Sequence, residues 1–289
     1  MDARSIAATA ANGGRITAAD EWGYEYECPK FDYDATSYEH RIYQGFGKGD
    51  PNAELVCGPN IKDWPEMPAL NEHMLLKVCA YITDPVTTTD ELIPSGETGS
   101  FRSNPMGLAE FTLSRRVPEY IGKAKAVMNH EKNRKNGTCP EEVADAIAKI
   151  RTISGFAEIK EEKIDLSSII YAVKPGDGSA REQAASCQRV LLGGANIAKE
   201  YATKRYRSNL INWGMVPFVT VSAPDFADDD YIFVPNIREA LEGSMVNIPA
   251  YVLGETIKPL TLAIAPLTKE EKDIIRAGSL INYNRMLKK

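Results

Sequence analysis

The chain has 289 residues, of which 43% are hydrophobic and 26% are charged. This balance is typical of a folded globular protein, and the length supports one large core or two smaller ones. Lys and Arg number 34 against 40 Asp and Glu, and the net charge of −6 argues against a dedicated nucleic-acid binder. No apolar run reaches the roughly 18–20 residues of a membrane span, and the N-terminus lacks a signal-peptide pattern. We therefore expect a cytoplasmic protein.

The cysteines are five in number and lie far apart in the sequence: Cys28, Cys57, Cys79, Cys139 and Cys187. An odd, scattered set argues against a disulfide framework. No two of them have the C-x-x-C spacing that closed zinc and iron–sulfur sites commonly use. The sequence therefore predicts no metal site built from this chain alone.

Residues 1–66 are rich in Gly, Pro, Asp and Tyr and show little periodicity. A segment of this length without periodicity does not indicate an independent domain. We interpret residues 1–66 as the tail of a preceding domain followed by a linker, and residues 67–289 as the main domain.

From about residue 67 the pattern alternates between strands and helices. Apolar runs predict strands at 75–81, 168–173, 216–221 and 231–234, and a hairpin or pair of strands at 246–265. Two capping boxes, at 138–141 and 268–271, predict helices behind them, and the first helix has Val143, Ala146, Ile147 and Ile150 on one face. The alternation predicts an α/β fold in which helices flank a sheet.

The stretch from Gly176 to Arg181 reads G-D-G-S-A-R and follows a predicted strand. The two glycines permit positive φ, and the expected helix start offers free N–H groups that favour an anion. Two interpretations follow: Ser179 and Arg181 form an anion-binding site, or Ser179 caps a helix and Arg181 faces solvent. A phosphate loop is disfavoured because no G-K-[ST] follows.

Several motifs, in order along the chain, resemble those of aconitases and isopropylmalate isomerases. GDGSAREQAA is similar to their G-x-G-S-S-R-E-H-A-A, and TTD at 88–90 is similar to T-T-D-H-I. Further matches are RVLLGGANIAKEYA at 189–202, the NL…GMVP run at 209–217 and RAGSL…N…RM at 276–286. The resemblance covers roughly residues 68–289. It implies the swivelling β/β/α domain found at the C-terminus of these enzymes, preceded by an irregular linker segment.

The resemblance also implies a hydro-lyase site. It identifies Ser179 as the base that removes a proton next to a carboxylate, and Arg102 and Arg181 as substrate carboxylate clamps. Asp90 matches a supporting acidic residue, and Ala180 matches a residue that contacts substrate through its main chain. Guanidinium groups suit this chemistry because they pair with both oxygens of a carboxylate and stabilise charge that develops on it.

The cofactor implied by the resemblance is a 4Fe-4S cluster, whose iron accepts the leaving hydroxyl. Cluster-bearing domains, in the same polypeptide or in a large subunit, would supply it, so we expect this chain to bind none and to be inactive alone. The implied substrate is a small hydroxy-polycarboxylic acid of the citrate or isocitrate type. Glu91 and Gln183 stand where aconitases carry histidines, and Ala180 replaces a serine, so the reaction type is better defined than the acid.

An alternative is a non-catalytic regulatory or RNA-binding module derived from an aconitase, for which Lys199, Lys204, Arg205 and Arg207 form a short basic cluster. We favour a solvated helix face for that cluster.

Three other patterns are interpreted structurally. The acidic run 228–230 is expected to be a turn rather than a metal site, and C-G-P-N at 57–60 lacks the second cysteine of a C-G-P-C cluster motif. Trp64 and Trp213 are expected to pack.

Overall fold

The computed structural model describes all residues except 24–29, 42–46, 55, 221–223 and 289, so Cys28 lies outside the described residues. The chain divides into two compact units, 1–55 and 56–289, which are treated separately. The first unit holds α1 (Ala3–Ala11) and α2 (Thr36–Arg41). The side chain of Asp2 caps α1 by accepting from the Arg4 and Ser5 amides. These short helices depart from the irregular structure expected for this region.

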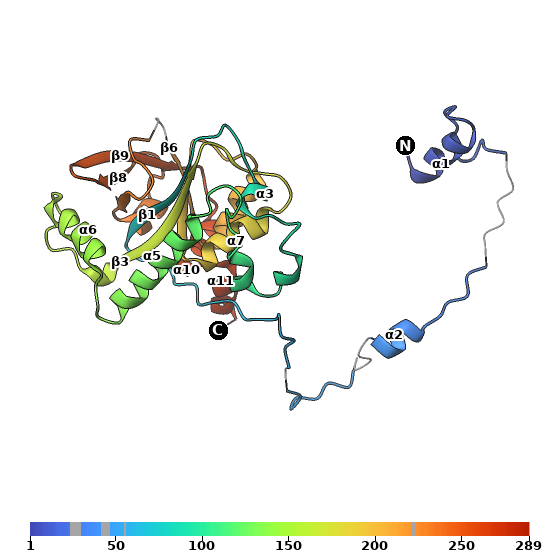
Figure 1. The fold of residues 1–289 in the computed structure, drawn as a ribbon, viewed down its shortest axis with the longest axis horizontal. Helices are drawn as coiled ribbons and strands as arrows, with labels where there is room; N and C mark the ends of the chain where they lie inside the picture. The colour runs from blue at the N-terminus through green and yellow to red at the C-terminus, as the bar shows by residue number, and fades with distance from the viewer. Residues whose placement is uncertain (24–29, 42–46, 55, 221–223, 289) are drawn as a thin grey trace. The chain divides into compact units, whose positions relative to one another are not determined.

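Seven strands of the second unit close into a barrel (Figure 1). Their order around it is β1 (His73–Ile82), β3 (Ile164–Ala172), β5 (Gly193–Ala198), β6 (Val216–Thr220), β9 (Ile257–Ile264), β8 (Ile248–Leu253) and β7 (Tyr231–Val234). The first four are parallel neighbours, and the remaining pairings, including β7 with β1, are antiparallel. The fold is thus mixed α/β, as the alternation predicts, whereas closure of the sheet was not predicted.

Alternate residues of the barrel strands belong to two apolar clusters. On β1, Leu76 and Val78 belong to a cluster with members from all seven strands, while Leu75 and Cys79 belong to the other. Side chains on a strand alternate between its two faces, so the cluster shared by every strand corresponds to the barrel interior. The second cluster joins the outside of the barrel to the helices.

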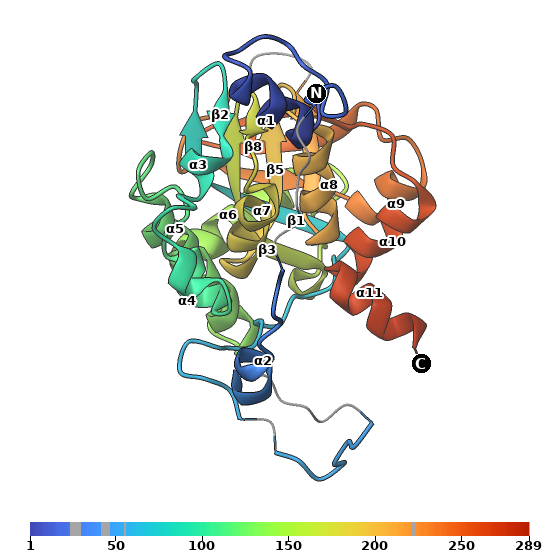
Figure 2. The ribbon, with the colours of Figure 1, turned by 90° about the vertical axis from the view of Figure 1, so that its right-hand side faces the viewer.

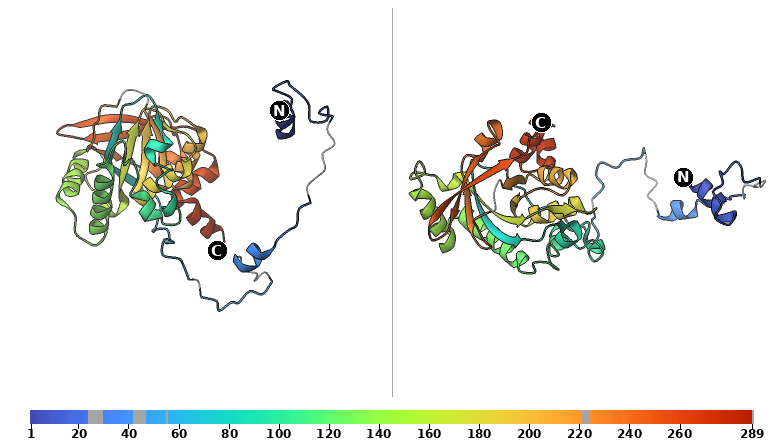
Figure 3. Two further views of the ribbon diagram at one scale, coloured as in Figure 1. Left: turned by 45° about the vertical axis from the view of Figure 1, so that its right-hand side comes forward. Right: turned by 90° about the horizontal axis from the view of Figure 1, so that it is seen from above.

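The helices of the second unit lie around the strands and against one another (Figures 2 and 3). They are α3 (Thr89–Leu92), α4 (Pro105–Ala109), α5 (Tyr120–Lys135), α6 (Glu141–Thr152), α7 (Arg181–Val190), α8 (Lys204–Asn212), α9 (Ile237–Glu242), α10 (Lys269–Ala277) and α11 (Leu280–Leu287), with 3₁₀ turns at Gly99–Phe101 (η1) and Glu161–Lys163 (η2). A separate two-stranded sheet pairs β2 (Thr87–Thr88) with β4 (Pro175–Asp177). Within the described residues, no helix is both long and apolar enough to cross a membrane.

One of the two predicted capping boxes is present. Thr268 accepts from the Glu271 amide at 3.2 Å, and Glu271 accepts from the Thr268 amide at 2.7 Å, so α10 begins as predicted. The box at 138–141 is wrong: the N-cap of α6 is Pro140, and no described side chain caps the helix there. The predicted apolar face of α6 is confirmed, because all four of its residues are buried.

The predicted strands correspond to β1, β3, β6 and β7, and the expected hairpin is β8–β9, with Leu253 opposite Ile257. Position 221 of the third prediction lies outside the described residues. The helix α5 was missed. Its buried positions Tyr120, Ala124, Val127 and Glu131 have helical spacing, but an alanine and a glutamate among them hide the apolar stripe. Glu131 is buried because Arg134 pairs with both of its oxygens.

Candidate functional site

The strand β4 delivers the chain to the start of α7, and its parallel partner β2 leads directly into α3. Thr87 pairs with Pro175, and Thr88 pairs with Asp177. The helix α3 contacts both β4 and α7. The T-T-D segment and the G-D-G-S segment, which begin 88 residues apart in the sequence, are therefore neighbours in space.

The two glycines of the G-D-G-S segment permit close approach, Gly178 to the T-T-D segment and Gly176 to α8. A Cβ on Gly178, which has φ of +129°, would lie 2.2 Å from the Thr89 hydroxyl oxygen. A Cβ on Gly176, with φ of +95°, would lie 2.3 Å from the ring of Tyr206. Side chains rarely adopt such φ values, so the G-x-G pattern serves both backbone conformation and close packing.

The segment that carries Arg102 reaches the same helix. Arg102 follows η1 and is exposed, and α4 begins three residues later behind the N-cap Asn104, which accepts from the Gly107 amide at 3.0 Å. The helix α4 packs against α7. Three elements from distant parts of the sequence thus contact α7: α3, β4 and α4, the last of which begins three residues after Arg102.

The start of α7 has no capping side chain among the described residues. Its N-cap is Ala180, so the interpretation of Ser179 as the capping serine is wrong; Ser179 precedes the cap and is exposed. Arg181 opens the helix and is half-buried, with its Nε buried and without a described partner. The first N–H groups of a helix have no intrahelical acceptor and carry partial positive charge. This end of α7 therefore presents unpaired donors.

Asp90 is held by two sets of donors. One oxygen accepts from the Ser95 amide at 3.2 Å and from its hydroxyl at 3.4 Å, and the other accepts from Arg115 at 3.1 Å. Arg115 also donates to Glu97 at 2.6 Å, and that bond raises the pKa of the guanidinium. The sequence analysis did not identify Arg115 as a site residue. Its only signal in the sequence is the basic pair at 115–116.

Glu91, which stands where aconitases carry a histidine, is used locally. Its side chain accepts from the Thr88 amide at 2.7 Å and from the Thr88 hydroxyl at 2.8 Å, which completes a capping box for α3. Arg116 lies 3.9 Å from its other oxygen and also pairs with Asp84. The replacement therefore stabilises the T-T-D turn.

A buried polar network lies beneath α7 and β4. The hydroxyl of Tyr206 accepts from Gln188 at 2.9 Å and from Asn196 at 2.8 Å, and burial raises the pKa of this phenol. Thr203 donates to the Gly176 carbonyl at 3.2 Å and caps α8. The network joins α7, β5, α8 and the G-x-G turn into one rigid unit.

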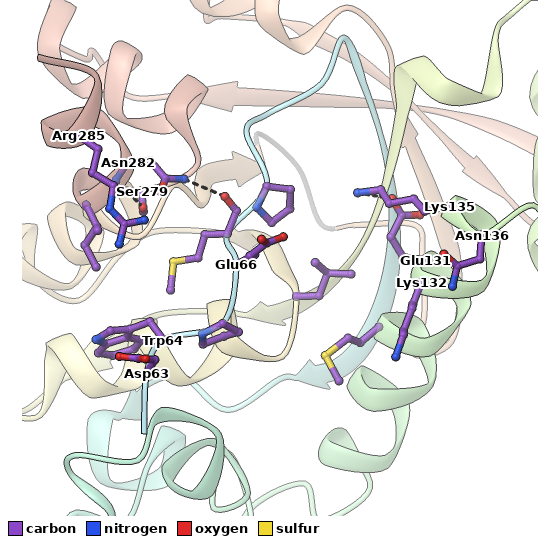
Figure 4. A pocket seen from close by; sticks show the side chains of 16 residues that line it. Asp63, Trp64, Glu66, Glu131, Lys132, Lys135, Asn136, Ser279, Asn282 and Arg285 are labelled. Atoms are coloured by element: carbon purple, nitrogen blue, oxygen red, sulfur yellow. Dashed lines mark hydrogen bonds and ion pairs between the residues drawn. The ribbon is translucent and has the colours of Figure 1, made fainter. Parts of the chain in front are cut away.

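A pocket of the second unit lies elsewhere. It has a volume of about 940 Å³ and is bounded by residues 63–68, the end of α5 and the region around α11 (Figure 4). None of Asp90, Arg102, Ser179, Ala180 and Arg181 lines it. The predicted site residues therefore lie outside this pocket: Asp90, Arg102 and Ser179 are exposed, and Ala180 and Arg181 are half-buried.

The described residues do not fit a metal or a cluster. They contain no group of three or more His, Cys, Asp or Glu side chains arranged to hold a metal ion. Cys79 and Cys187 are buried, which raises the pKa of each thiol to about 12, whereas Cys57 and Cys139 are exposed.

The remaining charged runs have structural contacts. The turn before β7 carries Asp228 and Asp229, both of which pair with Lys123. In the basic cluster, Arg207 donates to the carbonyls of Ala265 and Pro266 at 2.8 and 3.0 Å. Lys199, Lys204 and Arg205 are exposed.

Of the comparisons with known proteins, the one with solved structures finds matches. No family model matches the sequence, and no curated protein matches it. Among the solved structures that match is a 3-isopropylmalate dehydratase of Methanocaldococcus jannaschii, which is 19% identical. The match covers 75% of this chain and 95% of that chain, with a TM-score of 0.46.

Proposed function

We propose that this chain is the C-terminal part or small subunit of an aconitase-type hydro-lyase that dehydrates and rehydrates a hydroxy-polycarboxylic acid. The observation that carries the proposal is the meeting of the T-T-D and G-D-G-S segments at the uncapped start of α7. These segments bear the motifs that resemble the family, and their adjacency supplies the polar surface that an anionic substrate needs.

In this proposal each predicted residue has a distinct task. Arg102 and Arg181 bind substrate carboxylates. The buried Nε of Arg181 has no described partner, which supports a role for this side chain in binding an anion. Ser179 removes the proton next to a carboxylate, with the N-terminal end of α7 stabilising its alkoxide. Asp90, on α3, is the supporting acidic residue, and Ala180 contacts the substrate through its main chain.

The 4Fe-4S cluster of the complete enzyme is assigned to a partner region, because the residues described here do not fit it. The partner is a set of cluster-bearing domains, in the same polypeptide or in a large subunit. This chain contributes substrate binding and proton transfer. The citrate or isocitrate type of substrate belongs to the proposal as well.

The proposal is tested by combining the chain with a cluster-bearing partner of this enzyme class and following the dehydration of citrate and isocitrate. Removing a general base costs about 10²–10⁴-fold in rate, so Ser179→Ala should reduce turnover by that factor. Ser208→Ala, on α8, is the matched control and should leave the rate unchanged. No turnover of any hydroxy-acid, or full turnover in Ser179→Ala, would refute the proposal.

A further inference from the structure

The linker at residues 62–64 contacts the rest of the second unit at two points. The amide of Lys62 donates to the Ser103 carbonyl at 2.9 Å. The indole of Trp64 packs against Trp213 in a tilted arrangement, with ring centroids 4.5 Å apart and the ring planes 37° apart. An extended segment otherwise poor in backbone hydrogen bonds is thus fixed at specific places.

One contact is made to a residue adjacent to a proposed carboxylate clamp, and the other connects to the second clamp through one further side chain. Ser103 follows Arg102 directly. Trp213, the C-cap of α8, donates from its Nε1 to the Glu182 carboxylate at 3.1 Å, and Glu182 follows Arg181 in the first turn of α7. The linker therefore reaches one clamp through a backbone hydrogen bond and the other through an aromatic pair and a carboxylate.

The aromatic pair is asymmetric in its surroundings. Trp213 is 9% exposed, whereas Trp64 is 42% exposed. Trp64 also lines the 940 Å³ pocket; Figure 4 shows it with Asp63 on the side of Arg285, with Lys132 and Lys135 opposite. The Trp64 ring is therefore anchored through Trp213 while the linker beside it borders open space.

We propose that Trp64 and Trp213 are positioning residues, which hold Glu182 and hence Arg181 in place when the linker is seated. The linker is called seated when Trp64 packs against Trp213. The inference rests on the proposed function, because it assumes that Arg102 and Arg181 bind one anion. Linkage makes the effect reciprocal: an anion that orders the two clamps also favours the seated linker. Movement of the chain that precedes the linker would then change how firmly Arg181 is held at the substrate site.

Simple packing does not account for the arrangement as well. A packing role would require only that an apolar surface be covered, and the well-buried Trp213 already serves it. The indole N–H of Trp213 instead bonds a carboxylate in the first turn of α7, where a negative side chain is favoured by the helix dipole. The bond fixes the orientation of the ring against which Trp64 packs.

The experiment measures citrate binding by calorimetry and the near-ultraviolet circular dichroism of the tryptophan pair, in the full chain carrying Trp22→Phe. Two indoles packed this closely give a coupled signal, so the spectrum reports directly whether Trp64 is packed against Trp213. We expect citrate to change this signal. We expect Trp64→Ala to abolish the change and to weaken binding by about 5- to 150-fold, the usual range of coupling between two sites.

Conservative variants separate positioning from folding. Trp64→Phe keeps an aromatic partner and should restore most of the affinity, whereas Trp213→Phe keeps the aromatic pair but loses the N–H and should weaken binding. Ile281→Ala, in the same pocket, is the control and should bind citrate like the parent chain.

Two outcomes distinguish the possible failures. Citrate binding that depends on Arg181 but is equal in Trp64→Ala, with no change in the tryptophan signal, would overturn the positioning role and leave the proposed function standing. Absence of citrate, isocitrate and 2-isopropylmalate binding in the parent chain would overturn both.

Discussion

The backbone of Gly178 approaches Thr89 so closely that a Cβ at position 178 would lie 2.2 Å from the Thr89 hydroxyl oxygen. This contact joins the T-T-D segment to the G-D-G-S segment. It explains in physical terms why a glycine is needed two residues before the cap of α7: the φ of +129° and the short distance both exclude a side chain.

Gly178→Ala should therefore weaken citrate binding and lower the free energy of unfolding by about 1–3 kcal/mol, the usual cost of strained backbone. Gly122→Ala is the matched control, because Gly122 lies on α5 without positive φ and with open space around its Cβ. That change should raise stability by about 0.5–1 kcal/mol. Equal effects of the two substitutions in urea unfolding would contradict the role assigned to Gly178.

Arg189 should be indispensable for stability. Its guanidinium is buried and donates to the carbonyls of Pro68, Gly193 and Gly278 at 2.7, 3.2 and 3.1 Å, and burial lowers its pKa to about 10. Lysine cannot reproduce this planar set of donors. We expect Arg189→Lys to lower the free energy of unfolding by about 3 kcal/mol or more, since bonds to a charged group are worth about 1.5–3 kcal/mol each.

The control for that prediction is Arg205→Lys, because Arg205 is exposed on α8. Chemical denaturation of the two variants checks it. An Arg189→Lys chain as stable as the parent would show that the three carbonyls are satisfied without the guanidinium.

The sequence predicts six of the barrel strands and the Thr268 cap because those signals are local, with periodicity and capping set by neighbouring residues; β5 was missed. It does not predict the closed barrel, because closure depends on β7 meeting β1, more than 140 residues apart. Two other misses concern individual helices. The helix α5 buries Glu131 against Arg134, a pairing that hides its stripe, and the cap of α7 is Ala180 rather than the neighbouring serine.

The candidate site shows the same division. The motifs at 88–90 and 176–181 identify the segments, and the segments meet because β2 pairs with β4. These strands have two and three residues and are too short to be predicted from the sequence. Arg115, which holds Asp90, and Trp213, which holds Glu182, were not assigned these roles. Each binds a residue remote in the sequence, so only the folded chain reveals the contact.

His73 should make stability depend on pH. Its Nδ1 accepts from the Asn236 amide at 3.0 Å, and burial lowers its pKa below the ordinary 6.5, against the opposing effect of Glu72. The unfolded chain therefore takes up the proton first as pH falls below about 6.5, so the free energy of unfolding decreases between that pH and the lower folded pKa. The stability contribution is complete at higher pH.

His73→Asn keeps an acceptor for the Asn236 amide but cannot titrate in this range. Urea unfolding at several pH values from 5 to 8 should show a shallower decline at low pH in this variant than in the parent. Parallel curves for the two proteins would show that His73 does not carry the effect.

The most direct test of the central claim, that Arg102 and Arg181 bind the same carboxylate ligand, is calorimetric titration of citrate into the parent chain and the variants Arg102→Gln and Arg181→Gln. Each lost charge-assisted contact is worth about 1.5–3 kcal/mol, so each variant should bind about 10- to 150-fold more weakly. Arg205→Gln removes the same charge from α8 and should bind like the parent. Affinity unchanged in Arg102→Gln and Arg181→Gln, or reduced equally in Arg205→Gln, would contradict the account.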